Sequence, residues 1–162
     1  MISFKPTSEN DLPELLDLYN YHILNTTATF HLNPLSLNEM RNALPLNHSI
    51  YKTFTIYYDH QFCGYCYLNN YRPRQAYDRT AEITLYLKPE YHRKGIGRKT
   101  LRFLESEAKK TNIKNLLGVI TFENTASIIL FEKMAYTKVA HLKNIGEKFG
   151  RILDVTIFQK EI

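Results

Sequence analysis

The sequence has few cysteines and no long apolar run, and both absences restrict what this protein can be. No apolar stretch approaches the ~20 residues that a helix needs to cross a membrane. The first residues, MISFKPTSEND, contain no apolar core of the kind that secretory signal peptides carry. We therefore expect a cytoplasmic protein that does not associate with membranes.

Only two cysteines are present, Cys63 and Cys66, and no second pair or histidine stands at metal-ligand spacing from them. This arrangement argues against zinc, and we expect no metal site. A redox-active pair would open a helix, whereas Cys66 continues into the strand-like residues Tyr67 and Leu68. On a strand, an offset of three places two side chains on opposite faces. We predict that both cysteines are packing residues.

A concentrated basic region of the kind that binds nucleic acid is also missing. The chain has 21 Lys and Arg against 16 Asp and Glu, a formal net charge of +5, but the charges are spread along its length. It has no basic helix with interleaved aromatic residues, no zinc-finger spacing and no RNA-binding signature. We expect no nucleic-acid partner.

What the sequence does contain is typical of one globular domain, and we expect a single domain over residues 1–162. Periodicity and turn signals predict strands at residues 2–5, 54–58, 61–68, 80–87, 116–121, 137–142 and 152–159. Helices are predicted after Thr7 or Ser8, after Ser36, after Gly97 and over residues 125–134, with a loop at 143–151. The first helix is expected to bury Leu12, Leu15, Leu16, Tyr19 and Ile23. This order, β-α-α-β-β-β-α-β-α-β-β, predicts an α/β sandwich on one sheet.

The stretch from Thr80 to Lys110 carries the most specific signal. An alternating strand is stopped by Pro89, and Gly95 and Gly97 then lead into a helix. Such a turn directs several free backbone N–H groups and the positive end of the helix dipole at one point, which suits a phosphate.

This turn differs from two known phosphate-binding loops. Thr100 stands where the dinucleotide fingerprint needs a third glycine, and Arg98-Lys99 follows Gly97 where the P-loop needs Lys-Ser/Thr. The turn instead resembles the pyrophosphate loop of the GCN5-related N-acetyltransferases (GNAT), Arg/Gln-x-x-Gly-x-Gly/Ala. His92 departs from that pattern, and Arg93 beside it could supply the charge.

The resemblance extends over nearly the whole chain. The segment from Glu123 to Met134 looks like the second motif of this family. Four further features are similar to the branch of phosphinothricin and methionine sulfoximine (L-amino-acid) N-acetyltransferases: TATF at 27–30, RPR at 72–74, TAE at 80–82 and KFGR-x-LD at 148–154. The resemblance implies the GNAT fold, a mixed, mostly antiparallel central sheet with helices on both faces. It also implies acetyl-CoA as donor and a homodimer.

The resemblance further implies where acetyl-CoA binds. The backbone of the central strand would pair with the pantetheine arm, and an asparagine would open the helix beside it. The cofactor-binding residues implied in this way are Leu85, Tyr86, Leu87, Arg93, Lys94, Gly95, Ile96, Gly97, Arg98, Asn124 and Ser127.

Acetyl transfer to an amine needs a group that removes the ammonium proton. Glu82 lies in mid-strand on the face opposite Ile83 and Leu85. If that face lines a cleft, loss of solvent raises the pKa of Glu82 toward the range useful for a base; otherwise it is a carboxylate on an exposed sheet. The resemblance implies the role of general base, and we predict it for Glu82.

An α-amino-acid acceptor also carries a carboxylate, and arginine pairs with it in bidentate geometry. Arg72 and Arg74 precede the central strand and are our candidates, with solvated loop charges as the alternative. Tyr77 and Phe30 are predicted to form walls of the substrate pocket. We also expect Lys148, Phe149 and Arg151 to reach the site of the same or a partner subunit.

The group that protonates the leaving thiolate is left open. The family often has Tyr, and this branch His, where this chain has Phe131, which cannot donate a proton. The alternatives are that Tyr136 or solvent supplies the proton, or that the sulfur leaves as an unprotonated thiolate. We predict an acetyl-CoA-dependent N-acetyltransferase for a small amino acid or a toxic analogue. The alternatives are another amine (a protein N-terminus, a polyamine, an antibiotic) or a non-catalytic acyl-CoA-binding module.

Overall fold

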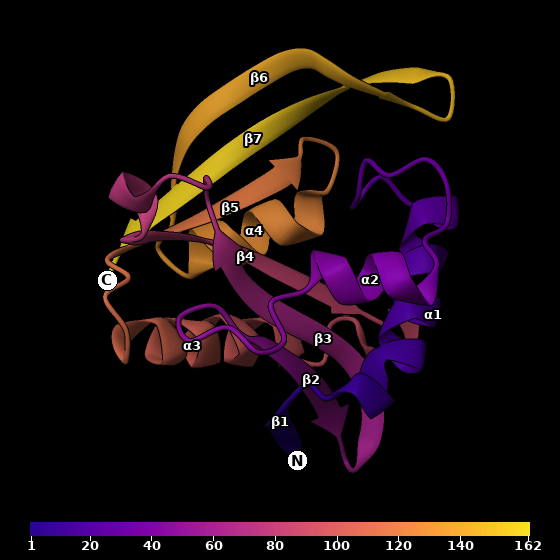
Figure 1. Cartoon of the computed structure of the whole chain (residues 1–162). Helices are drawn as coiled ribbons and strands as arrows, with labels where there is room; N and C mark the ends of the chain where they lie inside the picture. Colours follow the sequence, from indigo (N-terminus) through magenta and orange to yellow (C-terminus); the bar gives the residue numbers. More distant parts are fainter.

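The computed structural model describes the whole chain, residues 1–162 (Figure 1). Its strands are β1 (Ile2–Pro6), β2 (Thr53–Tyr58), β3 (Gln61–Asn70), β4 (Thr80–Leu87), β5 (Asn115–Thr121), β6 (Thr137–Lys148) and β7 (Arg151–Glu161). Its helices are α1 (Leu12–Asn25), α2 (Leu37–Ala43), α3 (Ile96–Lys109) and α4 (Thr125–Lys133). The predicted order of elements is confirmed. None of these helices is both long and apolar enough to span a membrane.

All seven strands form one sheet in the order β1-β2-β3-β4-β5-β7-β6. Neighbouring strands are antiparallel, except that β4 and β5 run parallel. A parallel pair needs a crossover connection, and α3 lies in that connection. The expected mixed, mostly antiparallel sheet is confirmed.

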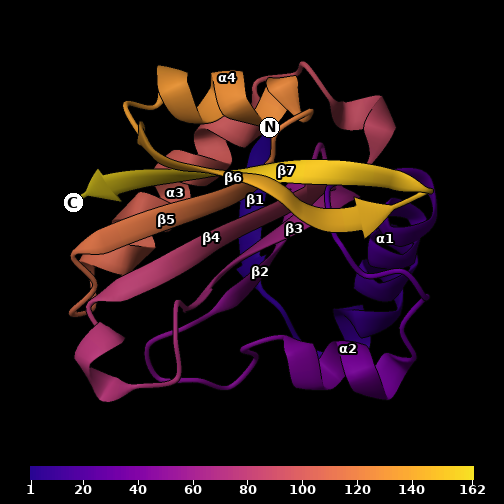
Figure 2. The same cartoon turned by 90° about the horizontal axis from the view of Figure 1, so that it is seen from above.

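Helices cover both faces of the sheet, as Figure 2 shows with α3 and α4 on one side and α2 on the other. The larger core cluster packs α3 and α4 against the sheet and includes Leu101, Leu104 and Phe131. A smaller cluster packs α1 and α2 against the other face and includes Leu12, Met40 and Tyr86. β4 therefore lies between two cores, and its successive side chains alternate between them.

The starts of α2 and α3 follow their local sequence, whereas Ser8 precedes a 3-10 turn over Glu9–Asp11 and α1 begins only after it. The predicted capping box of α2 is present, because Ser36 Oγ accepts from Glu39 N while the Glu39 carboxylate accepts from Ser36 N. α3 begins after Gly95, which has a φ of 75°, a left-handed conformation that glycine adopts without steric cost. The glycine turn thus sets where α3 begins and which way it points.

The buried face of α1 differs from the predicted one. Leu18 and His22 are buried, whereas Leu16 and Tyr19 are only partly buried. His22 is polar, so apolar periodicity could not identify it. Its Nε2–H donates to the carbonyl oxygen of Leu87 at 3.1 Å, which satisfies the buried imidazole.

The predicted loop at 143–151 is wrong. β6 and β7 instead form one long hairpin joined by Phe149 and Gly150. Both have positive φ, 54° and 67°, as a two-residue type I′ turn requires. Gly146 lies in an irregular part of the pairing, where Leu142 pairs with Val155 and Gly146 with Leu153. A glycine in a strand often marks such a bulge, and here it made the sequence resemble a loop.

The placement of the two cysteines on opposite faces is also wrong, although both are buried packing residues as predicted. Ile56 pairs with Gly64 and Tyr57 with Phe62, so Cys63 is the extra residue of a β-bulge. The bulge shifts the alternation by one residue. Both thiols therefore face the larger core.

Candidate active site

The site begins where β4 and β5 part. These strands pair only from Thr80 to Glu82, opposite Asn115 to Leu117. Beyond that point β4 stays paired with β3 up to Leu87, and β5 stays paired with β7. A gap therefore opens between two strands that are each held firmly on their other side.

The backbone of β4 presents free N–H groups to this gap. Arg79 O accepts from Asn115 N on the β5 side, while Lys88 N donates to Cys63 O on the β3 side. Because alternate residues of a strand direct their backbone groups to the same side, Leu85 and Leu87 direct their N–H groups toward the gap. No residue of β5 pairs with them.

A cavity of about 330 Å³ occupies the gap. Eleven of its 18 lining residues are hydrophobic, and such a wall with few polar groups is typical of a small-molecule site. The lining residues are Ala28, Thr29, Phe30, Tyr67, Glu82, Ile83, Thr84, Leu85, Tyr86, Gly118, Val119, Ile120, Thr121, Asn124, Ser127, Leu130, Phe131 and Val155. Glu82 is the one ionisable carboxyl among them, and none is a lysine, arginine or histidine.

Glu82 is placed at the point where the two strands separate. Burial raises the pKa of its carboxyl, and no hydrogen bond or ion pair opposes that shift. A carboxylate that has lost water without gaining a partner holds a proton more readily than one in solvent. Glu82 also lines the cavity, so the face of β4 that carries it is enclosed rather than exposed to bulk solvent.

The glycine turn lies at the start of α3. The backbone N–H groups of residues 93–98 donate to no protein acceptor. Arg93, Lys94 and Arg98 are exposed around them. The turn thus combines free N–H groups, local positive charge and a helix N-terminus, which together favour an anion.

α4 completes the neighbouring wall. The side chain of Asn124 accepts from Ser127 N at 3.2 Å and so caps the helix. Both residues line the cavity. A Cβ on Gly97 would lie 2.8 Å from Leu130 Cδ2, so glycine at this position allows the start of α3 to approach α4 closely.

Phe131 lies against the backbone of β5. A Cβ on Gly118 would meet Phe131 ring atoms at 2.1 to 2.8 Å, so the ring occupies the space that a larger residue would need. Tyr136 packs edge-on against Phe131, with ring centroids 4.9 Å apart. Tyr136 is buried in the larger core and does not line the cavity, and burial raises the pKa of its hydroxyl. Its hydroxyl is therefore poorly placed to protonate a leaving group in the cavity.

The residues predicted for the acceptor separate into two groups. Phe30 lines the cavity, with its ring against the backbone of Gly146 in β6. Arg72, Arg74 and Tyr77 are exposed in the connection between β3 and β4 and do not line the cavity. These three residues are close to Glu82 in sequence, but the structure leaves them in solvent.

None of the three hairpin residues predicted to reach the site lines the cavity. Lys148 is 2% exposed, and its Nζ donates to the carbonyl oxygen of Thr29 at 2.7 Å. Phe149 is exposed at the hairpin turn. In Figure 1 the hairpin extends toward the connection between α1 and α2. The hydrogen bond from Lys148 to Thr29 joins that connection to β6.

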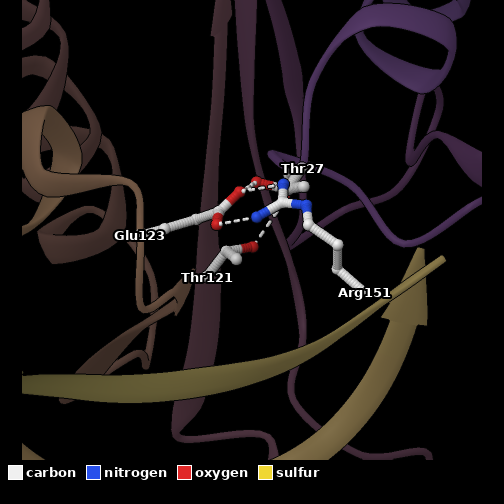
Figure 3. Close-up of polar contacts among 4 residues, drawn as sticks. All are labelled: Thr27, Thr121, Glu123 and Arg151. Atoms are coloured by element: carbon white, nitrogen blue, oxygen red, sulfur yellow. Dashed lines mark hydrogen bonds and ion pairs between the residues drawn. The ribbon is translucent and has the colours of Figure 1, made fainter. Parts of the chain in front are cut away.

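Arg151 takes part in a network that sequence reasoning missed (Figure 3). Its guanidinium donates twice to the Glu123 carboxylate, at 2.8 and 3.0 Å. Thr27 Oγ1 donates to the same carboxylate at 2.6 Å, and Thr121 Oγ1 donates to the carbonyl oxygen of Thr27. The hydrogen bonds from Arg151 and Thr27 lower the pKa of Glu123 to about 2. Thr27 and Arg151 are far in sequence from each other and from Thr121 and Glu123, so no local pattern could have revealed the network.

The chain is similar to known acetyltransferases over most of its length. The family model described as an acetyltransferase (GNAT) domain matches residues 5–157. The phosphinothricin N-acetyltransferase of Alcaligenes faecalis is 31% identical over 157 residues, which cover 95% of this chain and 79% of that protein. The L-methionine sulfoximine/L-methionine sulfone acetyltransferase of Salmonella typhimurium is 28% identical over 158 residues, covering 94% and 90%.

A solved structure is similar over nearly the same length. The GNAT superfamily phosphinothricin acetyltransferase from Sinorhizobium meliloti, in complex with acetyl-CoA, superposes with a TM-score of 0.92 at 26% identity. The match covers 99% of this chain and 88% of that chain.

Proposed function

The chain belongs to the GNAT family of N-acetyltransferases, and from that membership we propose that it transfers acetyl from acetyl-CoA to the amino group of a small amino acid or toxic analogue, such as phosphinothricin or methionine sulfoximine. The relatives named for these substrates support that acceptor class. The observation that carries the proposal is the cavity at the parting of β4 and β5, which brings Glu82 next to a free strand edge. Because the family is enzymatic, a non-catalytic acyl-CoA-binding module is no longer the alternative.

The residues around the glycine turn fit a coenzyme A pyrophosphate. The free N–H groups of residues 93–98 would donate to its oxygens. Arg93, Lys94 and Arg98 would balance its charge. Asn124 and Ser127 would flank the pantetheine arm from α4. Acetyl-CoA supplies the activated acetyl thioester when bound, as in the related structure with acetyl-CoA.

The free edge of β4 would hold the acetyl group. The N–H groups of Leu85 and Leu87 are directed into the gap and already lie on a rigid strand. They would polarise the thioester carbonyl, with no reorganisation at the moment of transfer. The pantetheine amides would pair with the same edge in the manner of an added strand. By the same alternation the backbone groups of Tyr86 face β3, so Tyr86 would contribute only as part of the cavity wall.

Glu82 would remove the ammonium proton, directly or through a water molecule. Its raised pKa brings it closer to the amine in basicity, and its position in the cavity brings it close to the acceptor. The neutral amine could then attack the carbonyl held by β4.

Neither Phe131 nor Tyr136 is suited to protonate the leaving thiolate. Phe131 cannot donate a proton, and Tyr136 lies behind it in the core. We infer that the sulfur leaves as a thiolate or takes its proton from solvent. Either route would make departure of the thiolate slower than with a positioned acid.

An amino-acid acceptor would also need a partner for its carboxylate. Arg72 and Arg74 have the right chemistry for it, with Tyr77 beside them and Phe30 as a cavity wall. No lysine, arginine or histidine side chain lines the cavity. That observation favours a second candidate, an amine without a carboxylate, such as a polyamine, an aminoglycoside or the N-terminus of a protein.

We also propose that the chain is a homodimer, as its branch of the family implies. β6 is an edge strand of the sheet. The β6–β7 hairpin also carries exposed apolar side chains that a partner subunit could cover: Val139, Leu142, Ile145, Phe149 and Ile152. Light scattering coupled to size-exclusion chromatography would report the mass directly, and a monomer would contradict the proposal.

The deciding experiment measures thiol release from acetyl-CoA against a panel of amines. The panel holds phosphinothricin, methionine sulfoximine, the common L-amino acids, polyamines and aminoglycosides, together with methionine sulfoximine methyl ester. Release with the amino acids but not with the ester would support the arginines as carboxylate partners. Release with the ester or the polyamines alone would favour the second candidate, and no release with any amine would contradict the proposed acceptors.

A further inference from the structure

Residues 27–30, here called the wall segment, form one side of the cavity. Ala28, Thr29 and Phe30 line it, and the segment follows directly after α1. Residues 27–30 make no backbone–backbone hydrogen bond. A segment without a backbone ladder owes its conformation to side chains that reach it from elsewhere.

Those side chains come from α1, where the Tyr19 hydroxyl shares a hydrogen bond with Thr29 Oγ1 at 2.8 Å, and from the end of β5 and the β6–β7 hairpin. The Glu123 carboxylate holds the Thr27 hydroxyl, and Thr121 holds the Thr27 carbonyl (Figure 3). Arg151 in turn fixes the Glu123 carboxylate with two parallel hydrogen bonds. Bidentate pairs of this kind define an orientation as well as an attraction.

The other end of the wall segment is held by β6. The buried Lys148 ammonium donates to the Thr29 carbonyl. The ring of Phe30 lies against Gly146, at a position where a Cβ would come within 2.3 Å of it. The segment is therefore fixed at both ends by elements that are themselves anchored in the sheet.

The Glu123–Arg151 pair is partly exposed, with 39% and 55% of the two side chains accessible. Exposed ion pairs contribute little to the free energy of folding. The pair is therefore better explained by the orientation it imposes on Thr27 than by a contribution to stability. Both groups carry their charge across the neutral range, because the pKa of Glu123 is lowered and that of Arg151 is raised.

We propose that Glu123 and Arg151 are positioning residues, which hold the wall segment in place through Thr27 and thereby set the affinity of the enzyme for its acceptor amine. This inference rests on the proposed function, because the affinity concerned is that for the acceptor. Neither side chain lines the cavity, so both act through the wall segment.

The first test is a kinetic comparison of Glu123→Gln, Arg151→Gln, Arg151→Lys and Thr27→Val with the wild type, using the best amine of the panel. We expect Glu123→Gln and Arg151→Gln to raise KM for the acceptor roughly tenfold, the effect of losing one charge-assisted hydrogen bond. KM for acetyl-CoA and the melting temperature should change little. Arg151→Lys should recover part of the loss, and Thr27→Val should reproduce it.

Lys138→Gln is the matched control, because Lys138 is an exposed cation on the same hairpin and lies outside the network. It should leave both KM values unchanged. The double variant Glu123→Gln/Arg151→Gln should be no worse than either single one, since each change breaks the same unit. Additive losses, unchanged acceptor KM, or a joint loss of kcat, both KM values and melting temperature would overturn the proposal.

Amide hydrogen exchange tests the inference without any turnover. Arg151→Gln should speed exchange at residues 27–31, while β4 and α3 stay protected as in the wild type. Unchanged exchange in the wall segment would overturn the positioning role. This readout separates the two proposals, because an enzyme inactive toward the whole panel could still show the loosened wall segment.

Discussion

At the scale of single residues, Glu82 combines features that local sequence could only partly anticipate. Its alternation with Ile83 placed it on the face opposite the apolar side chains, but whether that face was wet or enclosed depended on the parting of β5 from β4. In the structure the carboxyl lies in the cavity, and burial alone raises its pKa.

Glu82→Gln should lower kcat/KM by about two to four orders of magnitude, the usual contribution of a positioned general base. In the wild type, kcat/KM should fall at acid pH as the carboxyl becomes protonated, with a midpoint above 4.5 because burial raises its pKa. The variant should lose that pH dependence. Steady-state kinetics across pH measure both effects, and calorimetric binding of coenzyme A should be unchanged. Full activity in the variant would remove Glu82 from the mechanism.

The same substitution should make the protein more stable at neutral pH. The folded pKa of Glu82 is raised above its ordinary value of 4.5, so the folded state retains a proton that the unfolded chain has already released. Stability contributed by this group therefore falls as pH rises through that window and stays reduced above it. Thermal melts should give Glu82→Gln the higher melting temperature at pH 7 and a diminishing advantage toward pH 4. An equal or lower melting temperature at pH 7 would contradict this account.

At the scale of elements, close approaches across the cavity depend on glycine. Gly118 in β5 leaves room for the ring of Phe131 in α4. Sequence reasoning marked Gly95 and Gly97 because they belong to a local motif, but Gly118 has a purely tertiary reason. Its partner Phe131 lies on the next helix.

Gly118→Ala should destabilise the protein by about 1–3 kcal/mol, as overpacking of a well-filled core does. It should also displace Phe131 toward the cavity and raise KM for acetyl-CoA. Combining Gly118→Ala with Phe131→Leu should recover much of both losses, because the smaller side chain makes room for the added methyl group. Denaturant melts and kinetics on the two variants provide the measurement. A fully stable Gly118→Ala variant would contradict the packing argument.

The C-terminal hairpin shows where element prediction failed. The segment KNIGEKFGR contains two glycines and four charged residues, and we predicted a loop. Gly150 instead belongs to the hairpin turn, and Gly146 leaves space for the ring of Phe30. Only the pairing with β7 made this segment a strand, and that pairing places Lys148 and Arg151 beside the wall segment.

At the scale of the whole molecule, positive charge is spread widely but is locally dense at the start of α3. Arg93, Lys94, Arg98 and Lys99 surround N–H groups that are free of protein partners. A net charge of +5 also attracts an anionic ligand from a distance. Binding of coenzyme A should therefore combine a salt-sensitive part with a part that depends on backbone geometry.

We expect KM for acetyl-CoA to rise about fivefold as NaCl is raised from low concentration to well above physiological strength, because salt screens exposed charges. Arg93→Gln/Arg98→Gln should weaken binding and flatten the salt dependence, whereas Lys138→Gln, on β6 and outside the cavity lining, should leave the slope unchanged. Steady-state kinetics at several salt concentrations would show this. A KM for acetyl-CoA that does not change with salt would contradict this prediction and indicate that backbone N–H groups alone hold the cofactor.

The sequence by itself determined the order of elements, the glycine turn before α3, the strand that carries Glu82 and the resemblance to the acetyltransferase family. These depend on local periodicity, turn chemistry and short motifs, which neighbouring residues specify. The tertiary structure alone decided the parting of β4 from β5, the cavity without cations, the exposure of Arg72 and Arg74, and the network of Glu123, Arg151 and Thr27. Each of these arises from segments distant in the chain, and their contacts exist only once the sheet has brought those segments together.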